Sequence, residues 1–376
     1  MSGTDRQPLR QETRQETGLR SRRSLRQGLR RLYPLLVISA LYFAVLAYPV
    51  LRIGLLTFPD WRPGTPELLL IMVGPAAGRL AYEWLPGQIT RWLAAVTLTW
   101  LGTCFVAFTL LLPWELANVL LPLDGRSSGW ALLLASAALT GWGMANAQRL
   151  TVRHLDVTAP APAKGMRLAQ ISDVHVGSRS GRFLDRVVRR VNRERPDGVF
   201  ITGDLVDFHG IQRYELAALG RLEAPAWFVI GNHERYVDLE AICERLRSLG
   251  VRVLRNESLE SGALQIIGID DAEPKTQVGR VLPFFEPLAE RCRILLYHRP
   301  DGAADAAAWG AHLMLCGHTH NGQIVPFDHL VRRVFPRICG LYQVDGMTLY
   351  VSPGTGTWGP VMRLGSRCEI TMLHLR

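Results

Sequence analysis

The stretch MRLAQISDVH, residues 166–175, sets the fold of this chain. Its first six residues are mostly apolar, as in a buried strand, and the polar Asp173-Val174-His175 follows after Ser172. Five later apolar runs also end at polar, often glycine-containing turns: Val199–Thr202, Trp227–Ile230, Leu264–Ile269, Ile294–Tyr297 and His312–Cys316. The sequence therefore predicts a sheet whose strand ends carry polar side chains.

Helical patterns lie between the early strands. Apolar residues recur at three- and four-residue spacing in Phe183–Arg195, Tyr214–Leu222 and Leu239–Leu249. Strands that alternate with helices predict an α/β fold. Near the C-terminus, short strand-like runs at Leu341–Val344, Leu349–Val351 and Ile370–Leu375 suggest a second sheet that completes a sandwich.

The chain before residue 149 has a different character. Leu32–Leu51, Trp92–Trp114 and Gly129–Gln148 are uncharged and long enough to cross ~30 Å of hydrocarbon as helices. Leu68–Leu85 is a poorer candidate, because it contains Arg79 and Glu83. The sequence thus predicts a basic tail over 1–31, an all-α transmembrane region of about four helices over 32–148, a linker over 149–165 and a domain over 166–376.

The basic tail indicates the orientation in the membrane. Residues 1–31 hold nine arginines and three acidic residues, which favours a cytoplasmic N-terminus by the positive-inside rule. Four spans then return the domain to the cytoplasmic side of the inner membrane. The segment SRRSLR, residues 21–26, resembles a twin-arginine export signal and supports the alternative of an exported domain. No motif indicates nucleic acid binding, and six cysteines without a Cys-x-x-Cys pair indicate neither a zinc ribbon nor a disulfide framework.

Five polar clusters follow the predicted strands, where open α/β sheets bind ligands. They are Asp173-Val174-His175, Gly203-Asp204-Leu205-Val206-Asp207, Gly231-Asn232-His233-Glu234, His298 and Gly317-His318-Thr319-His320. Their carboxylates, imidazoles and amide suit manganese, iron or zinc better than calcium. A carboxylate such as Asp204 can bridge two ions ~3.5–4 Å apart, a spacing that suits phosphoryl transfer. Taken singly, each cluster also fits a turn, a helix start or a core histidine, and Asp207 fits a solvated turn; their order favours a metal centre.

This order of blocks resembles the calcineurin-like metallophosphoesterase superfamily, from Met166 to about Arg376. The resemblance implies a four-layer αββα sandwich with two metal ions, of which manganese is expected first. It implies one ion on Asp173, His175, Asp204 and His320, and another on Asp204, Asn232, His298 and His318. Attack by a metal-bridging hydroxide is implied too. His233 would then be the general acid or contact the phosphoryl group, with Asp207 orienting its ring.

The segment Gly317–Ile324, the Gly354–Gly359 turn and Arg363 are similar to a membrane-associated bacterial subgroup with phosphodiesterases and UDP-2,3-diacylglucosamine hydrolases. Asn321 and Arg299 depart from its pattern, which has Gly and Asn there. We expect a membrane-anchored enzyme that hydrolyses a phosphodiester or pyrophosphate bond, such as one in a lipid-linked substrate. The alternative is a membrane sensor or scaffold that binds a phosphorylated partner without turnover. Arg299 and Arg363 either bind substrate phosphate or are ion-paired, and Trp358 either covers a substrate group or packs.

Overall fold

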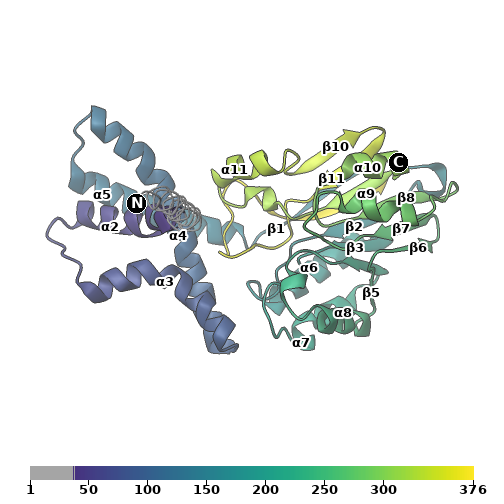
Figure 1. Ribbon diagram of the computed structural model, residues 1–376, viewed down its shortest axis with the longest axis horizontal. Helices are drawn as coiled ribbons and strands as arrows, with labels where there is room; N and C mark the ends of the chain where they lie inside the picture. The colour runs from purple at the N-terminus through teal and green to yellow at the C-terminus, as the bar shows by residue number, and fades with distance from the viewer. Residues whose placement is uncertain (1–36, 38) are drawn as a thin grey trace, which may run out of the picture.

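A computed structural model describes residue 37 and residues 39–376 of the chain. It has a helical region at one end and a domain of two sheets at the other (Figure 1). The predicted tail over 1–31 and the start of the first predicted span lie outside the described residues.

After helical residues 39–42, the helical region has a π-helical segment and then four α-helices. They are η1 (Phe43–Ala47), α2 (Tyr48–Thr57), α3 (Thr65–Trp84), α4 (Gln88–Leu120) and α5 (Gly125–Asn146). Within the described residues, Ser39–Thr57 and Gln88–Leu120 are long and apolar enough to cross a membrane. Both α3, which contains Arg79 and Glu83, and the glycine- and serine-rich α5 fall outside that group. The count of four spans therefore stays a prediction.

The first sheet has six strands in the order β1-β12-β2-β3-β4-β5. Their bounds are β1 (Leu150–Val157), β12 (Cys368–Leu375), β2 (Arg167–Ile171), β3 (Gly198–Thr202), β4 (Ala226–Val229) and β5 (Val251–Val253). The strands from β2 to β5 run parallel, so their carboxyl ends meet at one edge. The expectation that the C-terminal run joins the second sheet was wrong, because β12 pairs with β2 in the first.

The second sheet has the order β10-β11-β9-β8-β7-β6. Its strands are β6 (Glu257–Ser261), β7 (Leu264–Gly268), β8 (Cys292–Leu296), β9 (Leu313–Cys316), β10 (Gly340–Val344) and β11 (Met347–Val351). Strands β7, β8, β9 and β11 are parallel, whereas β6 and β10 are antiparallel to their neighbours. Both sheets are therefore mixed, and the predicted α/β sandwich is confirmed.

Helices cover the outer face of each sheet (Figure 1). The domain helices are α6 (Gly181–Glu194), α7 (Arg213–Leu216), α8 (Leu239–Ser248), α9 (Gln277–Val281), α10 (Ala303–Trp309) and α11 (Phe327–Val334). The apolar faces of α6 and α8 pack on the first sheet, and α9 and α10 pack on the second. A third apolar cluster, with Phe200 and Ile294, fills the space between the sheets. Burial of these three apolar clusters fixes the strands and therefore the positions of the strand ends.

Strand β1 changes the expectation of a linker over residues 149–165. Residues Leu150–Val157 pair in parallel with β12 along its whole length, from Leu150 against Cys368 to Val157 against Leu375. The first half of the predicted linker is therefore an edge strand of the sandwich. Its alternation of apolar residues with Thr151, Arg153 and Asp156 suits an edge strand, whose outer face meets water.

The helical region packs directly on the domain. Tyr82 of α3 belongs to the core cluster of the first sheet, and its hydroxyl donates to the His209 carbonyl at 2.6 Å. On α4, Val106 packs with Ile324, Met362 and Leu364 of the domain. The end of α5 is held by the Asn146 amide, which donates to the Arg363 carbonyl at 3.0 Å. The helices and the sandwich therefore share one packed interface.

Candidate metal centre

The predicted ligands gather where parallel strands of the two sheets end. Asp173 and His175 follow β2, Asp204 follows β3, His298 follows β8, and His318 and His320 follow β9. Five of these six have a backbone φ between 49° and 73°. Non-glycine residues rarely adopt this left-handed conformation, and such strain gathers at functional sites.

Glycines let these side chains approach one another. A Cβ atom at Gly231 would lie 2.2 Å from Asp204 Oδ1, and one at Gly317 would lie 2.2 Å from Asp173 Oδ2. Any side chain there would displace a carboxylate. These two glycines therefore keep room for the cluster.

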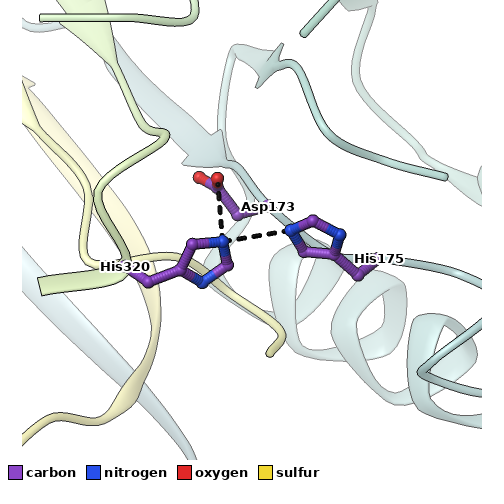
Figure 2. Close-up of side chains that lie close together, drawn as sticks. All are labelled: Asp173, His175 and His320. Carbon is purple, nitrogen blue, oxygen red and sulfur yellow. Dashed lines mark hydrogen bonds and ion pairs between the residues drawn. The ribbon is translucent and has the colours of Figure 1, made fainter. Parts of the chain in front are cut away.

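The first cluster consists of Asp173, His175 and His320, all buried. Figure 2 shows His320 facing both partners: its Nε2 lies 3.3 Å from Asp173 Oδ1 and 3.0 Å from His175 Nε2. Three ligand atoms from two segments, the turn after β2 and the turn after β9, thus lie close together. Two imidazole nitrogens and a carboxylate oxygen form a set suited to a divalent transition metal.

The second cluster consists of Asp204, His298 and His318. His298 Nε2 lies 3.1 Å from Asp204 Oδ2 and 3.2 Å from His318 Nδ1. The same Asp204 oxygen is 3.9 Å from His175 Nε2, in the first cluster. Asp204 therefore stands between the two clusters, where a bridging carboxylate would be.

Asn232 adds an amide oxygen to this group of donors. It follows β4, and its Oδ1 is buried without a hydrogen-bond partner among the described residues. A buried acceptor left unpaired costs free energy, and a cation would satisfy it. The unpaired oxygen and the facing imidazole nitrogens both fit a site built for metal ions.

Neighbouring backbone groups hold the ligands in place. The Thr202 carbonyl lies 2.8 Å from His298 Nδ1, which leaves Nε2 of that ring for the centre. The Ser172 hydroxyl donates to Asp173 Oδ2 at 2.5 Å, and the His318 amide donates to Asp173 Oδ1 at 3.0 Å. Such contacts fix the orientation of a ligand before an ion binds.

The electrostatics differ among the histidines of the two clusters. Burial lowers the pKa of His318 to about 3 and holds that of His320 well below its usual value, so both rings are neutral near pH 7, as ligands must be. Burial opposes charge on His298 too, but the Asp204 carboxylate raises its pKa to about 10. A proton on His298 therefore stands where an ion would bind.

His233 lies at the open side of the centre. Its side chain is 21% exposed, and its Nε2 is 4.0 Å from Asp204 Oδ2. The ring packs edge-on against His175 and Trp358, and burial lowers its pKa. The side chain thus reaches the centre from the solvent side, where a substrate would enter.

Asp207 does not have the contacts that the sequence predicted. Its carboxylate accepts from the Ser178 amide at 3.0 Å and from the Ser178 hydroxyl at 2.5 Å, and it lies 3.4 Å from His175 Nδ1. The sequence predicted that Asp207 orients the ring of His233, but its carboxylate contacts His175 instead. The reason is local: Asp207 N donates to the Val176 carbonyl, which fixes its segment beside the turn after β2.

Glu234 lies in one of the five predicted clusters, but no role in the site was predicted for it from the sequence. Its buried carboxylate accepts from the backbone amides of Asp204, Val206 and Gly231 at 2.8–2.9 Å. It therefore ties together the turns that carry Asp204 and Asn232. Burial, together with the charge of Asp204, raises the pKa of Glu234 to about 7. The signal in the sequence was the glutamate directly after Asn232-His233.

The two arginines considered for substrate binding are both engaged. Arg299 forms a two-point ion pair with Asp271, at 2.6 and 3.1 Å. Arg363 is fully buried and donates only within the protein, including to the His320 carbonyl at 3.1 Å. By contrast, Trp358 is 52% exposed beside His233, so it is available to a ligand.

Comparisons with known proteins place the chain in a family. The family model for calcineurin-like phosphoesterases matches residues 166–322. A "transmembrane protein with metallophosphoesterase domain" from Danio rerio is 35% identical over 271 residues, which are 65% of this chain and 62% of that protein. Uncharacterized metallophosphoesterases of Campylobacter jejuni and Aquifex aeolicus are 29% and 34% identical, over 72% and 56% of this chain and 79% and 85% of their own lengths.

This chain thus spans less than two thirds of the zebrafish relative. It spans most of the Aquifex relative, and six residues from four of the five predicted blocks form two groups that could hold metal ions. The chain belongs to the calcineurin-like metallophosphoesterases, a family of metal-dependent phosphoesterases.

Proposed function

We propose that this chain is a membrane-anchored, dinuclear-metal phosphoesterase that hydrolyses a phosphodiester or pyrophosphate bond. The observation that carries the proposal is the position of Asp204 Oδ2, 3.1 Å from His298 Nε2 and 3.9 Å from His175 Nε2. One carboxylate oxygen is thereby near ligands of both clusters. A pair of ions sharing a carboxylate suits in-line displacement at phosphorus.

The residues divide into two sets around Asp204. Asp173, His175 and His320 would hold one ion with it, and Asn232, His298 and His318 would hold the other. Manganese, iron and zinc all suit these donors, and we take manganese first. Such ions supply Lewis acidity and lower the pKa of a bound water towards neutrality.

His233 is the residue that we place at the substrate. Its partly exposed ring lies above Asp204, so an N–H of the imidazole can donate to a phosphoryl or leaving oxygen. Asp207 would act indirectly, by fixing the orientation of the His175 ring rather than that of His233. Trp358 and the exposed Tyr236 flank His233 and offer apolar surface to the rest of the substrate.

Two candidate spans and the membrane-named relative support membrane anchoring. The end of α2 contacts the start of α5, since a Cβ at Gly129 would lie 2.5 Å from the Thr57 amide. The other end of α5 contacts the domain. We accordingly propose four spans, a cytoplasmic domain starting near residue 149 and access to a lipid-linked substrate. Export of the domain remains the alternative topology.

A sensor or scaffold without turnover is the second candidate function. It would need the metal fold to bind a phosphorylated partner. The partly exposed His233 beside the centre favours turnover, because a binding-only site needs no proton donor.

The test is a substrate panel on the purified full chain. With manganese, it is assayed on bis(p-nitrophenyl) phosphate, p-nitrophenyl phosphate and a UDP-lipid pyrophosphate. The proposal expects cleavage of a diester or pyrophosphate, lost in His233→Ala with metal content unchanged. Two bound ions without turnover of any of the three would favour the scaffold.

A further inference from the structure

A cavity of about 620 Å³ lies between the end of α5 and the start of α6. It is lined mainly by basic and polar side chains, among them Gln148, Arg179, Arg182, Arg186 and Arg189, together with the ring of Phe183. None of these belongs to the metal centre. Gln148 comes two residues after α5, so the cavity lies where that helix leaves the bundle.

The cavity has a strong excess of positive charge. Four arginines line it, and among the described lining residues Asp185 is the one carboxylate. Asp185 is already paired with Arg189 of α6 and with Arg221. Its charge is therefore not available to neutralise the other three arginines.

Arg179 shows that the charge is incompletely paired. The side chain is 3% exposed, and its guanidinium lies 3.6 Å from the centre of the Phe183 ring. Nη2 donates to the Ala147 carbonyl at 3.0 Å, but Nε and Nη1 are buried and have no hydrogen-bond partner among the described residues. Buried charged donors without partners cost free energy, which an anionic ligand would recover.

We propose that this cavity binds a phosphate group, separately from the metal centre. Arginine forks match phosphate oxygens in a two-point geometry. The N-terminus of α6, capped by Ser180, adds partial positive charge at the same place.

The position of the cavity indicates where the phosphate comes from. Arg149 stacks on Trp142 of α5 at 5.4 Å, a pairing typical of helix ends at a membrane surface. Val361, from the loop that packs on the helical region, completes the lining. The head group of an anionic lipid would be presented at this level, and free phosphate shares its chemistry.

Two arginines at the C-terminal end of α6, outside the cavity, provide a matched control. Arg182 and Arg186 line the cavity and are exposed, so their replacement by glutamine leaves the core intact. Arg193 and Arg195 are also exposed but do not line it. The double variants Arg182→Gln/Arg186→Gln and Arg193→Gln/Arg195→Gln therefore remove the same charge at different places.

The experiment uses the full chain, from which a chelator has removed metal, so that the metal centre neither binds nor cleaves phosphate compounds. The chain is equilibrated with equal phosphatidic acid and phosphatidylcholine, and the retained lipid is counted by native mass spectrometry. Inorganic phosphate and glycerol 3-phosphate are then added as competitors.

The proposal expects retention of phosphatidic acid over phosphatidylcholine, reduced about tenfold in Arg182→Gln/Arg186→Gln and unchanged in Arg193→Gln/Arg195→Gln. Displacement by inorganic phosphate at low concentration would support the pocket and assign it to free phosphate. Resistance to both competitors would assign it to lipid. Equal retention of the two lipids, or equal loss in the two double variants, would overturn the proposal.

Discussion

Replacement of Arg363 by lysine separates a structural role from a role in substrate binding. The guanidinium donates to the carbonyls of His320, Pro353, Gly354 and Gly356 and to the Ser366 hydroxyl, at 2.7–3.3 Å. These acceptors belong to the loop after β11 and to the metal-binding loop after β9. The side chain therefore joins two loops at the centre.

The cost of the change follows from counting donors. Lysine offers three N–H donors on one nitrogen, so at least two of the five acceptors lose a charge-assisted bond. At about 1.5–3 kcal/mol for each such bond, the loss is at least about 3 kcal/mol. For a domain of this size, that lowers the Tm by roughly 6–12 °C. Because the His320 carbonyl is one of the acceptors, metal affinity should fall as well.

Thermal unfolding of the full chain in detergent, with metal titration and steady-state kinetics, tests this reasoning. Arg363→Lys should lower the Tm and the metal affinity, while KM at saturating metal stays unchanged. Arg367→Lys, at an exposed position nearby, is the control and should change neither. An unchanged Tm with a raised KM would show that Arg363 contacts substrate phosphate, and would refute its role in joining the two loops.

Three further predictions follow from single features. Asp207→Asn should weaken metal binding about 10- to 100-fold in a metal titration, because His175 loses the carboxylate that holds it. The control Asp345→Asn, at an exposed turn, should leave metal affinity unchanged. Equal metal affinities of the two variants would contradict a role for the contact between Asp207 and His175. Since the pKa of His298 without metal is raised to about 10, the ring is protonated near pH 7 and a metal ion must displace that proton. Metal affinity, measured by competition with a chelator, should therefore rise about tenfold from pH 7 to pH 8. A metal affinity that does not change with pH would be inconsistent with this reasoning. A chain starting at Met166 lacks β1 and leaves the edge of β12 open, so it should aggregate more in light scattering than a chain starting at Arg149; equal behaviour would count against the role of β1.

The candidate metal ligands were predictable because each comes soon after an apolar strand. Asp173 and His175, for example, follow a run whose length and composition already indicate β2. Parallel strands then bring the ligands to one edge, so local patterns were enough to place them together. The predicted helices Phe183–Arg195 and Leu239–Leu249 match α6 and α8 within two residues, since their apolar faces have clear helical spacing.

Other features depend on contacts between distant segments. Strand β1 was assigned to a linker because its polar residues hide the pairing with β12, more than 200 residues later. The burial of Arg363 is set by carbonyls of two loops, which no pattern around residue 363 encodes. The direction of Asp207 depends on the turn at Ser178, so spacing alone could not distinguish His175 from His233 as its neighbour.

Metal content measured together with activity tests the dinuclear centre most directly. The full chain is stripped of metal, reloaded with manganese, and assayed for bound ions by mass spectrometry and for hydrolysis of bis(p-nitrophenyl) phosphate. We predict about two ions per chain and metal-dependent turnover. In Asp204→Asn, the loss of the shared carboxylate should lower binding at both clusters and abolish turnover. A full complement of ions and normal activity in Asp204→Asn would contradict the shared centre.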